Sequence, residues 1–194
     1  MEITSAQLKE LRDQTGISVM QCKKALEEAQ GDMDKAKIIL QKKSGEIAAK
    51  KSDRELGAGT IGAYVHSTGE VAALVNLSCE TDFVSKNAEF ISLARDVAMH
   101  VAAQYPLYIR REEVTPEAME KAREVFMEEV KDKPAEMQEK ILSGKLDAFF
   151  SDRVLMEQPF IKDGEKTVGD LISAAIQKFG ENVVISNITR LSVK

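Results

Sequence analysis

The chain has 194 residues, of which 43% are hydrophobic and 30% charged, and its formal net charge at pH 7 is -5. This length fits one ordinary domain plus a small one, and the composition is typical of a soluble globular protein. The net charge argues against direct nucleic-acid binding, because Lys and Arg that neutralise phosphates supply most of that affinity. No run of about 18 apolar residues occurs, and the N-terminal segment carries charges where a signal peptide would be apolar, so we expect a cytoplasmic protein without a membrane segment.

Residues 1–54 have the pattern of three short helices. Capping side chains and helix-ending glycines alternate along this segment: Thr4 or Ser5, Gly16, Ser18, Gly31 and Asp32. Ser18 and Gln21 have the spacing of a capping box, in which each side chain accepts a backbone N–H of the other. The charged stretch 42–55 is typical of a helical extension or a linker. We therefore predict an N-terminal helical module with its linker in residues 1–54 and a second domain in residues 55–194.

The pattern becomes strand-like after Gly59. Two β-prone runs flank residues 67–70, which predicts a β-hairpin. The run VVISNITRLSV at residues 183–193 is rich in β-branched side chains, and we expect it to join the hairpin as a third strand.

Helical patterns occupy most of the sequence between these strands. After Asn87, a capping residue, apolar side chains repeat at helical spacing: Phe90, Leu93, Ala94, Val97, Ala98 and Val101. Further helices are expected after Thr115-Pro116, after Pro134 and from Thr167 to Gly180, with a loop at residues 156–166. The predicted fold class is α+β: a three-helix module, followed by a core in which a small antiparallel sheet packs against helices.

Motifs for catalysis are absent or out of context. Gly57, Gly59 and Gly62 match GxGxxG, but a dinucleotide site needs a strand before the glycines and a helix after them, whereas here the order is reversed. We interpret them as a flexible linker that enters a strand. His66 and His100 lack metal-ligand spacing, and no GxSxG elbow occurs. We expect no enzyme activity, no cofactor and no metal.

Both cysteines are expected to be reduced thiols. Cys22 and Cys79 lie in segments that look structurally separate, and neither belongs to a CxxC motif.

The stretch CETDFVSKN, residues 79–87, places a large apolar ring among polar side chains. Two interpretations are open. Phe83 and Val84 can pack under the sheet and fasten the turn between strand and helix. Alternatively, Phe83 is exposed on a turn held by rigid elements, which is how an interface residue is presented to a partner.

Two stretches together resemble a known family. Residues 11–26, LRDQTGISVMQCKKAL, are similar to the N-terminal signature of translation elongation factor Ts. Residues 79–86, CETDFVSK, resemble its second signature, and residues 158–160 and 166–169 resemble its C-terminal region. The resemblance spans nearly the whole chain, although Ser78 stands where many members have Asn.

The resemblance implies a guanine-nucleotide exchange factor that binds the translational GTPase elongation factor Tu and promotes GDP release. It implies that the N-terminal module, which is similar to ubiquitin-associated modules, binds the GTPase while Asp82 and Phe83 insert near the nucleotide's magnesium site. The partner-binding residues carried over by position are Arg12, Val19, Met20, Thr81, Asp82, Phe83 and Val84.

The chain is similar to the short form of the family, because longer members carry a further core section with a coiled-coil insertion. A homodimer that engages two GTPases is therefore considered. An alternative from another class is a helical adaptor, in which residues 1–52 bind another protein and no nucleotide exchange occurs.

Overall fold

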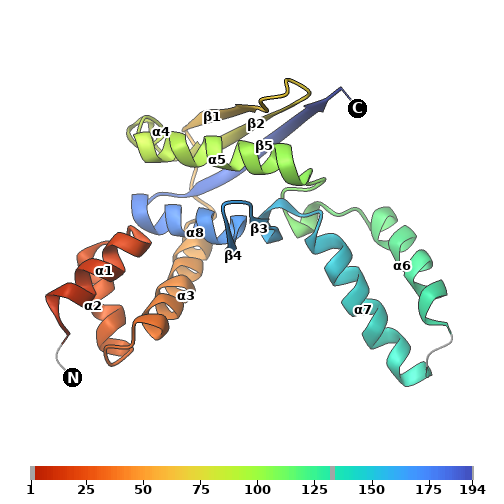
Figure 1. The fold of residues 1–194 in the computed structure, drawn as a ribbon, viewed down its shortest axis with the longest axis horizontal. Coiled ribbons are helices and arrows are strands. Elements are labelled where there is room, and N and C mark those ends of the chain that lie inside the picture. Colours follow the sequence, from red (N-terminus) through yellow and green to blue (C-terminus); the bar gives the residue numbers. More distant parts are fainter. Residues whose placement is uncertain (1–2, 132–133, 194) are drawn as a thin grey trace.

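The structure of the chain, a computed structural model, describes residues 3–131 and 134–193. A small sheet lies along one side of the molecule and has helices on one face only (Figure 1). A helical module lies below one end of the sheet, and a two-helix hairpin projects beyond the other end (Figure 1). This arrangement confirms the predicted α+β fold.

The N-terminal module contains three helices, α1 (Ser5–Thr15), α2 (Val19–Glu28) and α3 (Met33–Lys51). Each starts after a residue whose side chain accepts a backbone N–H of the first turn: Thr4, Ser18 and Asp32. The helices enclose their own apolar cluster: Leu11, Ile17, Cys22, Ala25, Leu26, Ala29, Ala36 and Leu40. These contacts make the module a packed unit with its own core.

The capping box predicted at Ser18 is only half formed. The Ser18 hydroxyl accepts the Gln21 N–H at 3.4 Å, but the Gln21 side-chain oxygen accepts the Gln177 amide at 3.0 Å instead of a backbone group of Ser18. A tertiary hydrogen bond has therefore replaced the local one.

The main sheet has three antiparallel strands in the order β1-β2-β5, namely β1 (Ala58–Val65), β2 (Val71–Cys79) and β5 (Val183–Ser192). β1 and β2 form the predicted hairpin, with Gly69 at a positive φ of 73° in its turn. β5 pairs with β2, as expected for the third strand. At the end of β2, Cys79 lies opposite Ala58 on one side and Val183 on the other.

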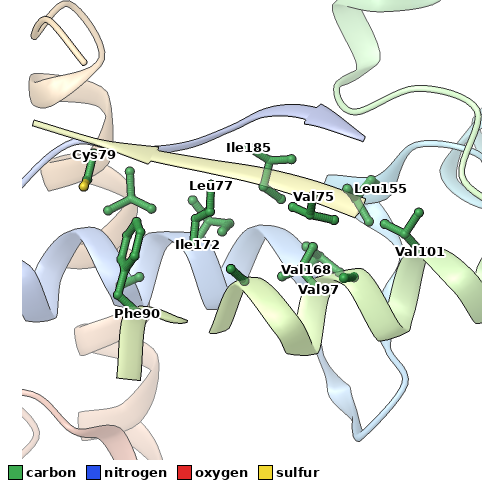
Figure 2. Close-up of a cluster of buried hydrophobic side chains, with 14 of the residues drawn as sticks. Val75, Leu77, Cys79, Phe90, Val97, Val101, Leu155, Val168, Ile172 and Ile185 are labelled. Carbon is green, nitrogen blue, oxygen red and sulfur yellow. The ribbon is translucent and has the colours of Figure 1, made fainter. Parts of the chain in front are cut away.

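Two helices, α5 (Ala88–Gln104) and α8 (Val168–Phe179), cover one face of this sheet. In Figure 2, Val75 and Leu77 of β2 point toward Val97 of α5 and Ile172 of α8. Five of the six apolar residues predicted for the face of α5 are buried, and Leu93 is half-buried at its edge. The core of the second domain therefore lies between the sheet and these helices.

Gly62 brings β1 and α5 into close contact. A Cβ atom at this position would lie 2.1 Å from the carbonyl oxygen of Ala94 in α5. Gly59 and Gly62 both belong to β1, so these glycines lie in a strand and do not lead into a helix. This agrees with the interpretation as a linker that enters a strand, and Gly62 is fixed in that strand by its contact with α5.

The helices α6 (Pro116–Val130) and α7 (Ala135–Ser151) form the projecting hairpin. Its own apolar cluster contains Ala122, Val130, Leu142, Leu146 and Phe150. A short 3-10 helix, η1 (Arg111–Glu113), precedes it. Both helices were predicted from the sequence. Their pairing into a projecting hairpin was not predicted.

Residues 156–166 contain more structure than the predicted loop. The 3-10 helix η2 (Leu155–Glu157) leads into a two-stranded hairpin of β3 (Pro159–Phe160) and β4 (Asp163–Thr167). Buried His100 holds this segment, since its Nδ1 accepts the Ile161 N–H at 3.2 Å and its Nε2 lies 2.9 Å from Gln158 Oε1. These strands are too short to show an alternating pattern, so the sequence does not reveal them.

The charged stretch 42–55 continues α3 as far as Lys51, which makes it a helical extension. This extension packs against α8: buried Ser44 hydrogen-bonds the side chain of Gln177, and Gln41 donates to Asp170 at 2.7 Å. The helical module is therefore joined to the core by these polar side chains and by Ile47 and Ala48 of α3, which pack against the core cluster. The domain boundary near Arg54 remains a prediction.

We predict that Gly62→Ala destabilises the protein, because the new methyl group would push α5 away from the sheet. The expected loss in the free energy of unfolding is about 1–3 kcal/mol, as for other overpacked cores. Urea denaturation measures it. Gly144→Ala is the control, since a Cβ there meets nothing within 4 Å, and we expect it to be neutral or to stabilise α7 by up to about 1 kcal/mol. Equal stability of Gly62→Ala and the wild type would contradict the close contact.

Candidate functional site

Phe83 is the most exposed large apolar side chain in the described part of the chain, with 83% of its surface accessible. It lies on α4 (Asp82–Ser85), a single helical turn between the end of β2 and the start of α5. The next residue, Val84, is only 4% exposed and belongs to the core under the sheet. The fastening role considered for both residues is therefore wrong for Phe83 and holds for Val84.

Val84 does not present its side chain to a partner in this structure. It was carried over as a partner-binding residue, but its side chain packs under the sheet because successive residues of a helical turn point about 100° apart. Val84 supports the turn on which Phe83 is displayed.

Asp82 stands beside Phe83 with its carboxylate in solvent. The Lys86 ammonium donates to Asp82 Oδ2 at 2.6 Å, and both side chains are about three-quarters exposed, at 76% and 74%. This hydrogen bond lowers the pKa of the Asp82 carboxyl below its usual value, so the group is ionised at neutral pH. Exposed ion pairs contribute little to stability. The carboxylate can therefore exchange Lys86 for another partner at little cost.

A second exposed patch lies where α1 turns into α2. Arg12 is exposed in the last turn of α1, while Val19 and Met20, at the start of α2, are 45% and 65% exposed. Gly16 permits the tight turn between them, with a positive φ of 68° and its N–H bonded to the Arg12 carbonyl at 2.7 Å. The three residues carried over for the first contact thus flank one turn.

The two patches belong to the same end of the molecule (Figure 1). Lys178 of α8 links them: its ammonium would lie 3.3 Å from a Cβ added at Gly16, and it pairs with Glu89 in the first turn of α5. That turn begins at Ala88, shortly after α4 ends at Ser85. The helical module therefore presents Met20, and the core domain presents Asp82 and Phe83. The two parts contact each other through α8.

Thr81 is exposed, but its hydroxyl is engaged within the chain. It donates to Glu181 Oε1 at 2.5 Å and makes no capping bond to α4. None of the sequence patterns above indicated Glu181, although a signal was available. Once 183–193 is placed beside β2 with Cys79 opposite Val183, the residues just outside both strand ends must be neighbours.

Three further features were considered as signs of a binding site: a metal-ligand cluster, an apolar hollow and a membrane-spanning helix. Within residues 3–131 and 134–193, no group of three His, Cys, Asp or Glu residues is arranged to hold a metal ion. An apolar hollow of about 360 Å³, lined in part by Leu107, Phe126 and Phe149, lies at the α6–α7 hairpin, away from both patches. No helix in the described part of the chain has both the length and the apolar character needed to cross a membrane.

Both cysteines are free and buried in different apolar clusters. Burial raises the pKa of the Cys22 and Cys79 thiols, which keeps them protonated at neutral pH. Cys79 lies under the exposed turn, and its thiol donates to the Thr81 carbonyl at 3.2 Å. These thiols are structural groups in the core.

Comparison with known proteins gives a consistent result. The family model described as "Elongation factor TS" matches residues 19–194. The chain is 48% identical over 193 residues to elongation factor Ts of Thermosipho melanesiensis, covering 98% of both chains. It is equally similar to the proteins of that name from Thermotoga maritima, with 100% of this chain and 97% of the relative covered, and from Carboxydothermus hydrogenoformans, with 98% and 89% covered.

We predict opposite effects on stability for truncation of the two neighbours on α4. Val84→Ala leaves a cavity under the sheet and should lower the free energy of unfolding by about 2 kcal/mol. Phe83→Ala removes an exposed ring and should change it by no more than about 0.5 kcal/mol. Chemical denaturation of the isolated variants measures both values. Destabilisation of Phe83→Ala by as much as Val84→Ala would show that the ring belongs to the core.

Proposed function

The chain belongs to the elongation factor Ts family, and from this premise we propose that it is the guanine-nucleotide exchange factor of elongation factor Tu, which accelerates release of GDP. One observation carries the proposal: Phe83 is 83% exposed on a turn whose neighbour Val84 is fixed in the core. A mobile aromatic side chain on a flexible loop would be ordered only on binding, at an entropic cost. Here the Phe83 ring is already exposed to solvent before the partner binds.

The mechanism we propose for Phe83 is preferential binding to a distorted GTPase. Burying an aromatic side chain removes about 150–250 Å² from water, which is enough to dominate a small contact. Such a contact shifts a conformational equilibrium only if it is better in one state than in the other. The ring would therefore enter a pocket that opens when the nucleotide site is disturbed.

We assign a separate role to Asp82. Its carboxylate is ionised and exposed, and its side-chain partner is the equally exposed Lys86. Placed near the nucleotide's magnesium site, it would compete for the water and hydrogen-bond network that orients the metal's ligands. Phe83 thus supplies binding energy, and Asp82 supplies the charge that disturbs the magnesium environment.

Arg12, Val19 and Met20 are proposed to bind the body of the GTPase. Their surface combines one cation with two exposed apolar side chains around a rigid turn. Methionine adapts its shape to a partner surface readily. This contact would set the affinity, while the Phe83 contact acts on the nucleotide.

No acid or base of the factor is needed for this activity, and we propose that the protein is not an enzyme. If factor and GDP each weaken the binding of the other to the GTPase, thermodynamic linkage makes the effect reciprocal. A bound factor then speeds the loss of GDP, and incoming nucleotide helps to release the factor. We propose that this takes place in the cytoplasm, without direct contact to nucleic acid or membrane.

We also propose that the protein forms a homodimer through the uncovered face of its sheet. Exposed apolar side chains occur on all three strands: Ile61 and Val65 on β1, Leu74 on β2 and Leu191 on β5, with exposures from 48% to 67%. Val65 lies opposite Ala72, which in turn lies opposite Leu191, and Ile61 lies opposite Asn76. Because alternate residues of a strand share a face, Leu74 lies on the same side as Ala72 and Asn76, and this side is opposite to the helices. An open apolar sheet face of this kind is typical of an association surface. A dimer would carry two Phe83 turns and engage two GTPases.

We predict that Phe83→Ala loses exchange activity while remaining folded. The assay follows fluorescent GDP leaving elongation factor Tu under excess unlabelled GDP, at increasing factor concentration. Removal of the ring should weaken the complex by about 2 kcal/mol, which is about thirtyfold in affinity, and lower the saturated release rate. Met20→Ala is the contrasting variant: it should raise the concentration for half-maximal release and leave the saturated rate close to normal.

Three results of this assay would count against the proposal. Normal release by folded Phe83→Ala would rule out the insertion mechanism. A lowered saturated rate with unchanged concentration dependence in Met20→Ala would contradict its docking role. No nucleotide release by the whole chain, together with binding of a protein partner by residues 1–52 alone, would favour the helical adaptor.

We predict that Leu74→Glu converts the homodimer to a monomer, because a carboxylate would be buried in the apolar sheet interface. Sedimentation equilibrium measures the mass. Ile91→Glu is a matched control, since Ile91 on α5 has a similar exposure of 46% but does not lie on the sheet. We expect a dimer with a dissociation constant of about 1 μM or lower. A wild-type protein that stays monomeric at about 0.1 mM, which is about 100 times that value, would contradict the proposed dimer.

A further inference from the structure

The turn that displays Phe83 is held by a reciprocal pair of carboxylates. Cys79 lies opposite Val183 in the sheet, so residues 80–81, just past β2, run beside residues 181–182, just before β5. Each of these short segments contributes one glutamate that binds the backbone of the other. We call Arg54, Glu80, Glu181 and Asn182 the acid clamp.

Glu181 holds the start of the turn. Its Oε2 accepts the N–H groups of Glu80 at 3.1 Å and Thr81 at 3.0 Å, while its Oε1 accepts the Thr81 hydroxyl at 2.5 Å. A carboxylate that receives several hydrogen bonds at once is a strong and directional acceptor. Since α4 begins at the next residue, Asp82, these bonds fix the direction in which the helical turn leaves the sheet.

Glu80 makes the return contact. Its Oε1 accepts the N–H of Asn182 at 2.5 Å, and both of its oxygens lie 3.2 Å from Nη1 of Arg54. The bond from Asn182 is the main cause that lowers the pKa of the Glu80 carboxyl, which keeps this acceptor ionised at neutral pH.

The clamp also reaches the segment that leads from the helical module. The Asn182 side chain is 2% exposed, and its Nδ2 donates to the carbonyls of Ser52 at 3.4 Å and Arg54 at 3.3 Å. Residues 52–54 follow the end of α3 at Lys51 directly. One set of hydrogen bonds thus joins the end of the N-terminal module, the turn that carries Phe83 and the start of β5.

We infer that Glu181 is a positioning residue for nucleotide exchange: through the acid clamp it fixes the direction of the Asp82-Phe83 turn relative to the N-terminal module. The inference rests on the proposed exchange function. A four-residue helix cannot hold its own shape in water, because helix nucleation is unfavourable. Val84 anchors α4 under the sheet, and the acid clamp fixes where α4 starts. The contacts of Arg12 and Met20 with the GTPase then place Phe83 correctly only if the turn has one fixed direction.

This inference assigns a different role to Thr81. Its hydroxyl points to Glu181 and does not cap α4, so it acts on the GTPase through the clamp and not by direct contact. The hydroxyl joins the exposed turn to a residue 100 positions later in the chain.

The test compares Glu181→Ala with Glu181→Gln in the GDP-release assay. Glutamine preserves the geometry, because its carbonyl can accept both N–H groups and its amide can donate to the Thr81 hydroxyl. We expect Glu181→Ala to lower the saturated release rate by about tenfold to a hundredfold, as misplaced groups do, with little change in the half-maximal concentration. Glu181→Gln should recover most of the rate. Glu124→Ala, which removes an exposed acid from α6, is the control.

A second pair of variants keeps the test independent of the folding of Glu181→Ala. Thr81→Val replaces the hydroxyl by a methyl group and should lower the saturated rate, whereas Thr81→Ser keeps a hydroxyl and should retain the rate. Hydrogen exchange of the free protein gives a readout apart from activity: the Glu80 and Thr81 amides should lose protection in Glu181→Ala while those of β2 keep it.

The outcomes separate the inference from the function on which it rests. If the wild type releases no GDP, the proposed function fails and the positioning role falls with it. If the wild type is active and Phe83→Ala is not, but Glu181→Ala and Thr81→Val keep the wild-type saturated rate, only the positioning role is overturned. A shift in half-maximal concentration alone, with an unchanged saturated rate, would show that Glu181 affects only the affinity for the GTPase and would also overturn it.

Discussion

The close contact between α5 and the sheet is the constraint on which the exposed turn depends. Because Gly62 lets the backbone of α5 approach β1 directly, the start of α5 is fixed a few residues beyond the end of β2. The chain has room there for only one helical turn. Val84 fills the space under the sheet, so Phe83, its neighbour on that turn, has to point outward. The exposure of an apolar ring follows from the packing of the core and needs no strain in the backbone.

Much of the fold could be predicted from local signals, because those signals act within a few residues. Caps such as Thr4, Asn87 and Thr167 gave the helix starts, and the β-branched run at 183–193 gave the third strand. The direction of Phe83 could not be predicted, since one helical turn is too short for periodicity to show which side faces the core. The bonds of Glu181 to residues 80–81 were missed for a different reason: they join segments about 100 positions apart and depend on strand register.

The junction between the helical module and the core differs in character from both interiors. Each interior is apolar. The junction combines the apolar contact of Ile47 and Ala48 of α3 with the core cluster and a polar group in which the Gln177 side chain hydrogen-bonds both Gln21 and Ser44 in a largely buried site. Polar groups that are buried together must satisfy each other, which favours one relative placement over many that apolar packing would tolerate. The two patches that we assign to the GTPase are therefore held at a defined separation by hydrogen bonds.

The α6–α7 hairpin has an apolar cluster of its own and lies at the end of the molecule opposite to α4 and to α1 and α2 (Figure 1). Segments with separate cores tend to open and close as independent cooperative units. The hairpin can therefore lose structure without loosening the turn that carries Phe83. In evolutionary terms, we expect its length and surface to vary between relatives more freely than the sheet and α5, which set the position of the Phe83 turn.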